Sequence, residues 1–160
     1  MKTRRSSEVM TSMRDFCRRN QIPVSHEDLN AFLIEKYNGP TQDVSVFIFY
    51  DPSNFRLVVN PKSGETIDSS VLGDVLTYHN AANSASVNTT LFVCPHCERI
   101  EMFATIHRHD DGLSDIEIEE MLDQIIGQFE YHASVVQDII SGKVKIADAV
   151  QKAMERKRLI

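Results

Sequence analysis

The chain has 160 residues, of which 42% are hydrophobic and 25% charged, and its formal net charge is −6. This length fits one domain and allows one hydrophobic core to stabilise it without disulfide bonds. The longest apolar run covers only residues 46–50, whereas a helix that spans a bilayer needs about 20 apolar residues. The composition therefore excludes a protein built on membrane-spanning helices.

Charge is unevenly distributed along the chain. Residues 1–20 and 143–160 each carry a net charge of +4, whereas residues 21–142 carry −14. A nucleic-acid-binding domain gathers Lys and Arg on one face, so an acidic body with two basic ends does not favour nucleic acid as a partner. We interpret the basic ends as neutralising the acidic body. The alternative is a free basic end that contacts RNA, DNA or an acidic partner.

The N-terminus and the cysteines both indicate a cytoplasmic protein. Residues 1–17 start with basic side chains but lack the apolar segment of a signal peptide. Three cysteines, Cys17, Cys94 and Cys97, are too few and odd in number for a disulfide framework, which fits a reducing compartment. We therefore expect a cytoplasmic protein that makes no membrane contact.

The first 40 residues are predicted to form an N-terminal helical segment. Residues 8–19 place apolar side chains at helical spacing behind a serine cap. Residues 25–28 have the pattern of a second helix start. The apolar residues that follow keep helical spacing until Gly39-Pro40, and they are Leu29, Phe32, Leu33 and Tyr37. We therefore expect two helices here.

Residues 41–142 are predicted to form an α+β domain. Two stretches of period-two alternation on each side of a helical stretch indicate two hairpins with a helix between them. The continuous apolar run at residues 46–50 indicates a strand with both faces covered. The predicted elements are strands over 44–50 and 55–60, a helix from about 69, whose inner stripe is Val71, Leu72, Val75, Leu76 and His79, and strands over 89–94 and 99–107.

A long amphipathic helix closes this domain. Ser114 and Glu117 have the spacing of a capping box, and apolar side chains keep helical spacing from there to Ser141-Gly142. Residues 143–160 are predicted to form a separate basic C-terminal helix. The expected fold class is thus α+β: an antiparallel sheet built from two β-hairpins with a helix between them, with N-terminal helices and the long C-terminal helix packed on one face.

The tetrapeptide Cys94-Pro95-His96-Cys97 resembles the active site of DsbA-type thiol oxidases. In that family a helix begins at the first cysteine, because the helix terminus lowers the thiol pKa, and a proline loop follows later in the chain. Here residues 99–107 alternate with the period of a strand, and no proline follows Pro95. These departures do not favour a redox enzyme.

A zinc site is the next interpretation, because Cys94, Cys97, His107 and His109 are ligands of suitable type. An extended strand would place His107 roughly 30 Å from Cys97, however. We therefore interpret the motif as the turn of a hairpin, and we assign no catalytic, cofactor-binding or metal residue. A thiol-redox or zinc-binding protein that uses this motif stays open as the alternative. His79 and His132, on apolar helix faces, are interpreted as core histidines.

Residues 44–142 resemble in pattern the YbjN-like family of bacterial sensory-transduction regulators, which shares its fold with type III secretion chaperones. The likeness is carried by a hairpin leading to a helix that ends in residues 75–83, by the strand pair after it, and by Gly112-Leu113-Ser114 before the long helix. The sequence departs from the family in two respects. Two strands are predicted before the middle helix where the fold has three, and the two N-terminal helices and the basic C-terminal helix have no place in the family pattern.

The resemblance implies a non-enzymatic protein-binding module, chaperone-like or a regulatory adaptor, that uses no cofactor. Its partner would be another protein or an extended segment of one, and the chain would itself form a homodimer. By analogy with the chaperones, the expected binding residues are exposed apolar residues of the sheet, such as Phe47, Phe49 and Phe103.

Overall fold

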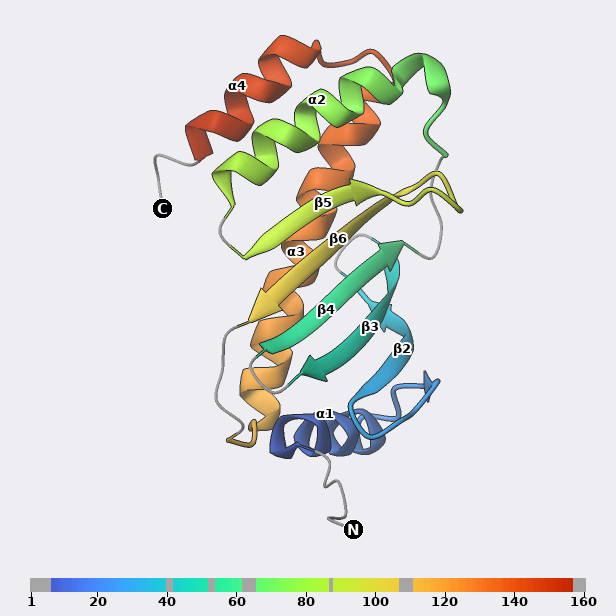
Figure 1. Cartoon of the computed structure of the whole chain (residues 1–160), viewed down its shortest axis with the longest axis vertical. Helices are drawn as coiled ribbons and strands as arrows, with labels where there is room; N and C mark the ends of the chain where they lie inside the picture. The colour runs from blue at the N-terminus through green and yellow to red at the C-terminus, as the bar shows by residue number, and fades with distance from the viewer. Residues whose placement is uncertain are drawn as a thin grey trace.

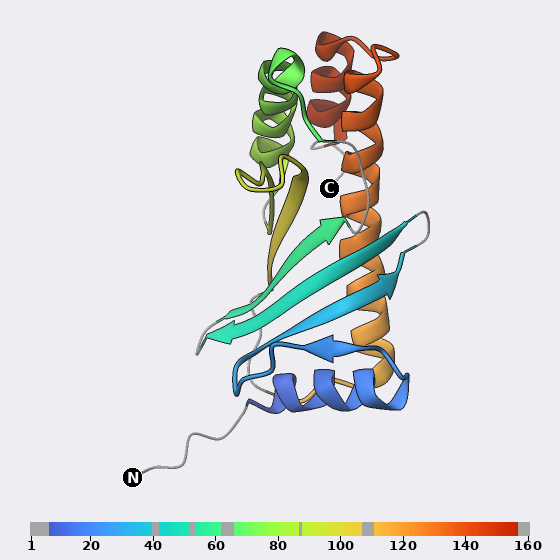
Figure 2. The same ribbon diagram turned by 90° about the vertical axis from the view of Figure 1, so that its right-hand side faces the viewer.

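The structure, a computed structural model, describes residues 7–39, 42–51, 54–61, 66–86, 88–106 and 111–156. Within these residues, four helices accompany a six-stranded antiparallel sheet in the order β1-β2-β3-β4-β6-β5, so the predicted α+β class is confirmed (Figures 1 and 2). The elements are α1 (Glu8–Arg19), β1 (Val24–Ser25), β2 (Ala31–Asn38), β3 (Asp43–Asp51), β4 (Asn54–Pro61), α2 (Ser69–Ala85), β5 (Thr89–Val93), β6 (Ile100–Ile106), α3 (Asp115–Ile140) and α4 (Ile146–Arg156).

Both predicted hairpins are present. β3 and β4 pair from Val44 opposite Pro61 to Asp51 opposite Asn54. β5 and β6 form the second hairpin, and β6 also pairs with β4, so the two hairpins join into one sheet although α2 separates them in the sequence.

The second predicted helix is wrong, because residues 31–38 form strand β2. Phe32 and Ile34 are fully buried while the residues between and after them are less buried, which is the period of a strand. Leu29, expected on the buried stripe of a helix, is 47% exposed. β2 pairs with β3 over most of its length. It and the two-residue strand β1 are therefore two strands before the middle helix that the sequence pattern missed.

Helix α3 runs along one face of the sheet, and the core lies between them (Figure 2). Alternate residues of the central strands are buried on this face, and Leu122 and Phe129 of α3 are fully buried as well. The buried strand residues are Val44, Val46, Ile48, Leu57, Val59, Ile100, Met102 and Ala104. The expectation that both faces of β3 are covered is wrong, because the alternate side chains Phe47 and Phe49 are only half-buried.

Helices α2 and α4 lie beside each other at one end of the molecule, and α1 lies at the other end (Figure 1). The inner stripe of α2 differs from the predicted one. Val75, Tyr78, His79 and Ala82 are buried, whereas Leu76, which the sequence placed inside, is 43% exposed. The helix ends at Ala85.

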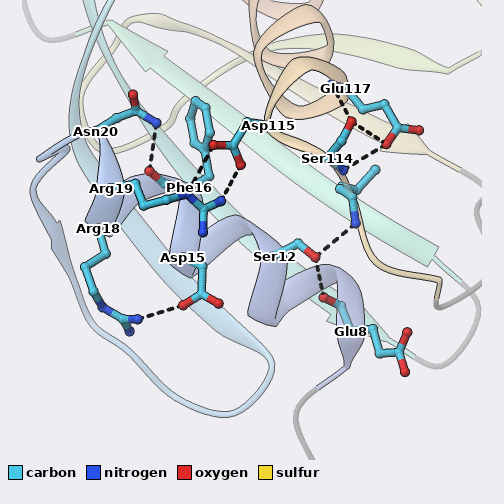
Figure 3. A network of polar contacts seen from close by, with 11 residues as sticks. Glu8, Ser12, Asp15, Phe16, Arg18, Arg19, Asn20, Ser114, Asp115 and Glu117 are labelled. Carbon is cyan, nitrogen blue, oxygen red and sulfur yellow. Dashed lines mark hydrogen bonds and ion pairs between the residues drawn. The ribbon is translucent and has the colours of Figure 1, made fainter.

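Polar contacts join α1 to the start of α3, although about 100 residues separate them (Figure 3). The backbone N–H of Leu113 donates to Ser12 Oγ at 2.9 Å, and the Arg19 guanidinium forms an ion pair with Asp115. Ser114 and Glu117 form the predicted capping box at the first turn of α3. These contacts fix the position of α1 relative to the first turn of α3.

Candidate functional site

The face of the sheet opposite α3 carries a row of apolar side chains. Leu33, Phe47, Val58 and Phe103 are register partners across β2, β3, β4 and β6. Phe49 extends the row, since its ring lies 5.7 Å from that of Phe47 and 6.1 Å from that of Phe103. All five side chains are half-buried. Together with Arg56, they are called the open face below.

Arg56 lies among the rings of the open face. Its guanidinium carbon is 5.9 Å from the centre of the Phe49 ring and 6.0 Å from the centre of the Phe103 ring. This is the distance range of a cation–π contact. The charged group of Arg56 therefore packs against the aromatic cluster.

None of the described helices lies over the open face, which faces the viewer in Figure 1 in front of α3. Contiguous apolar surface of this kind commonly marks an interaction site. The sequence named Phe47, Phe49 and Phe103 as binding candidates, and the fold brings all three together. The sequence analysis missed Leu33, because it assigned that residue to a helix. It also missed Val58, which the pairing of the predicted hairpin places opposite Phe47.

The edge of the sheet at β5 is partly occupied by a side chain. Asn83 of α2 donates from Nδ2 to the carbonyl oxygen of Leu91 at 2.9 Å, and its Oδ1 accepts from the Leu91 N–H at 2.7 Å. Ser86 Oγ accepts from the Thr89 N–H. These contacts occupy three of the backbone groups that a strand added at this edge would need. At the opposite edge, β1 has only two residues.

The motif Cys94-Pro95-His96-Cys97 forms the turn between β5 and β6, as the sequence predicted. The Cys94 N–H donates to the Arg99 carbonyl at 2.8 Å, and the Glu98 N–H donates to the Cys94 carbonyl at 2.9 Å. Glu98 has φ of 54°, the left-handed conformation that turns the chain back. Its carbonyl accepts from the Ile67 N–H, which ties the turn to the segment before α2. No helix begins at Cys94, so the structure lacks the local context of the thiol oxidases.

Both cysteines of the turn lie near a carboxylate. The sulfur atoms of Cys94 and Cys97 and an oxygen of Glu101 all lie within 4.8 Å of one another. Cys97 Sγ is 3.7 Å from Glu101 Oε1. Burial, together with a hydrogen bond to Cys94, raises the pKa of the Cys97 thiol. The sequence missed Glu101 as a member of this group, and the predicted companions His107 and His109 lie outside the described residues.

A cavity of about 510 Å³ lies between α2, α3, α4 and the strands β5 and β6, and its walls include Ala82, Ala104 and Met121. His132 also borders it, and its Nδ1 is 2.7 Å from the Tyr78 hydroxyl. His79 is 2% exposed, and its ring nitrogens have no hydrogen-bond partner among the described residues. Burial lowers the pKa of His79 to about 4, so this core histidine is neutral at pH 7.

None of the described helices combines the length and the apolar composition that a membrane-spanning segment requires. No family model matches the sequence, and no curated protein matches it. A solved structure, that of YbjN, "a putative transcription regulator from E. coli", matches with a TM-score of 0.53 and 10% sequence identity, over 78% of this chain and 87% of that chain. Similarity at so low an identity shows the fold alone. The chain therefore has a YbjN-like fold, as its sequence pattern predicted.

Proposed function

We propose that this chain is a non-enzymatic binding module of the bacterial cytoplasm, a regulatory adaptor or chaperone that holds an apolar segment of another protein on the open face. The observation that carries the proposal is the aromatic cluster of Phe47, Phe49 and Phe103, half-buried on a sheet face that no described element covers. Aromatic residues and Arg are enriched in the buried centres of protein interfaces.

The arrangement of the sheet favours its face over its edges as the place of binding. Strand addition requires a free row of backbone groups. At β5 the groups of Leu91 are already bonded to Asn83, and β1 is too short to act as a template. A partner segment that lies across the row from Leu33 to Phe103 needs none of those groups, because it gains its affinity from apolar contact.

The side chains of the open face are suited to binding rather than to chemistry. Rings and aliphatic groups offer apolar area, and ring contacts with a partner add about 0.5–1.5 kcal/mol per pair beyond the area that they bury. Arg56, held among the rings, adds a flat surface for stacking. The proposal of a module without catalytic activity rests on this surface and on the resemblance of the sequence pattern to a family that shares its fold with type III secretion chaperones.

The test compares two variants that place the same charge on different surfaces. Phe103→Glu puts a carboxylate at the β6 end of the open face, beside the Phe49 ring, and Ile116→Glu puts one on α3, where Ile116 is 68% exposed. Proteins captured from the native host by the wild-type chain should be lost with Phe103→Glu and kept with Ile116→Glu. Calorimetry then measures the affinity of each captured protein for the purified chains. Each captured protein should bind the wild-type chain at least about tenfold more tightly than it binds Phe103→Glu.

Equal capture by both variants would refute the open face as the binding surface. Light scattering on the same three proteins tests self-association, since a homodimer through this face would dissociate in Phe103→Glu alone. A captured partner that is nucleic acid, released steeply by salt, would support the alternative role for the basic ends instead.

A further inference from the structure

We propose that Cys94, Cys97 and Glu101 bind one zinc ion at the turn between β5 and β6. Two thiolates and a carboxylate are ligands that zinc accepts, and three protein ligands leave a fourth position for water or another small ligand. The site does not rest on the proposed function, because it requires no partner protein. Both thiols lose their protons to solvent when the metal binds.

The spacing of the three groups already approaches that of a tetrahedral zinc site. With Zn–S of about 2.3 Å and Zn–O of about 2.0–2.2 Å, a tetrahedron separates two sulfurs by about 3.8 Å and a sulfur from an oxygen by about 3.6 Å. Cys97 Sγ and Glu101 Oε1 are 3.7 Å apart, and all three ligand atoms lie within 4.8 Å of one another. Small side-chain rotations therefore complete the geometry.

The backbone of the turn holds the two cysteines in place. Hydrogen bonds from the Cys94 N–H to the Arg99 carbonyl and from the Glu98 N–H to the Cys94 carbonyl close the loop at both ends. The left-handed conformation of Glu98 turns the chain back toward β6, which begins at Ile100. Glu101 then lies on that strand, on the same face as Phe103. A turn that is already closed loses little entropy when it binds a metal ion.

A neighbouring amide orients the carboxylate. With the Asn60 amide placed so that its nitrogen faces Glu101, that nitrogen donates to Oε1 at 2.8 Å and to Oε2 at 3.2 Å. Metal-ligating carboxylates commonly have such a partner, and its loss typically costs 10–100-fold in metal affinity. Asn60 belongs to β4, so the sheet itself positions the third ligand.

This ligand set differs from the one that the sequence suggested. From the residue types in the sequence, His107 and His109 were the candidate ligands beside the two cysteines. The pairing of Phe92 with Glu101 instead places a carboxylate next to the turn. The third ligand is thus four residues after Cys97, and it approaches the sulfur because the turn folds the chain back.

The test uses the full chain, freed of metal by a chelator and kept reduced so that Cys94 and Cys97 cannot form a disulfide. Titration with Co²⁺ should saturate at one ion per chain and produce the near-ultraviolet absorption of thiolate-to-cobalt charge transfer, and added Zn²⁺ should abolish it. Cys97→Ser should weaken zinc binding by more than about 100-fold, beyond the loss typical of a supporting residue.

Three further variants distinguish the carboxylate ligand, the amide that orients it and a cysteine outside the site. Glu101→Gln should keep the thiolate absorption while weakening zinc binding by more than about tenfold, and Asn60→Ala should weaken it by about tenfold. Cys17→Ala is the matched control, because Cys17 is fully buried in the core and away from the turn; it should leave the titration unchanged. The absence of saturable one-to-one binding, or a spectrum that survives Cys97→Ser in a folded protein, would overturn the proposal.

Discussion

The side-chain amide of Asn83 in α2 bonds both the N–H and the carbonyl of Leu91 in β5, at 2.7 and 2.9 Å. One side chain thereby takes the place that a neighbouring strand would occupy at this edge. Exposed edges promote unwanted pairing between chains, and proteins often cover them with a helix or loop. Here the Asn83 amide does so together with Ser86 Oγ, which accepts from the Thr89 N–H, and the amide also anchors α2 to the sheet.

Replacing Asn83 by alanine should destabilise the protein and expose the β5 edge. Loss of both bonds leaves backbone groups of a partly buried strand without partners, which costs about 1–3 kcal/mol of unfolding free energy. Denaturant unfolding measures this change, and light scattering should detect concentration-dependent association. Asn80→Ala, at an exposed position on the same helix, is the control. It should change the unfolding free energy by less than about 0.5 kcal/mol and leave the association state of the protein unchanged.

Stability should fall as the pH is lowered through the range in which the unfolded chain protonates His79. The pKa of His79 is about 4 in the fold and about 6.5 when unfolded, so between these values the unfolded state binds more protons. The contribution of neutral His79 to the unfolding free energy is therefore complete above pH 6.5, and it decreases as the pH falls below that value. From pH 7 to pH 5, the loss amounts to about 2 kcal/mol.

Chemical denaturation at both pH values measures this difference. In His79→Leu, which cannot titrate at this position, the drop between pH 7 and pH 5 should be smaller by about that 2 kcal/mol. An unchanged drop in the variant would show that other groups cause the pH dependence.

Zinc should stabilise the folded chain if the turn binds it. A ligand at about 100 times its dissociation constant raises the unfolding free energy by about 2.7 kcal/mol, provided that the unfolded chain does not bind it. Unfolding with and without zinc measures this gain under reducing conditions. Cys94→Ser should remove it, whereas Cys17→Ala should retain it whatever its own stability. Equal gains in both variants would indicate metal bound elsewhere.

The cap of α3 should contribute to stability in a directly measurable way. Ser114 accepts from the Glu117 N–H, and the Glu117 carboxylate accepts from the Ser114 N–H at 2.8 Å. Ser114→Ala should therefore cost about 1 kcal/mol in thermal or denaturant unfolding. Ser141→Ala, the same substitution at the other end of the helix, should change stability by less than about 0.5 kcal/mol. Similar losses at both ends would argue against a special role for the capping box.

Elements with local signals could be predicted closely from the sequence. Helix α1 has the predicted bounds, and α3 begins after the predicted cap and ends at the predicted stop. Capping boxes and helical periodicity depend on neighbours within a few residues, so a pattern of letters records them. The alternation of residues 99–107 predicted the strand β6 for the same reason.

Residues 31–38 show where such signals fail. Their apolar residues fit helical spacing, and Phe32 and Ile34 equally fit the spacing of a strand. The pairing of β2 with β3 decides between the two, because a free strand edge next to an apolar segment offers more contacts than an isolated helix. This information lies in another part of the chain.

The sequence by itself determined the α+β class, the order of most elements, the candidate aromatic residues and the turn at Cys94-Pro95-His96-Cys97. Only the tertiary structure decided that Phe47, Phe49 and Phe103 share one uncovered face, that Asn83 blocks a sheet edge, and that Glu101 approaches the cysteines. Local structure follows from short-range sterics and hydrogen bonds, whereas neighbourhood on a sheet depends on strand register and helix packing, which the chain acquires only as a whole.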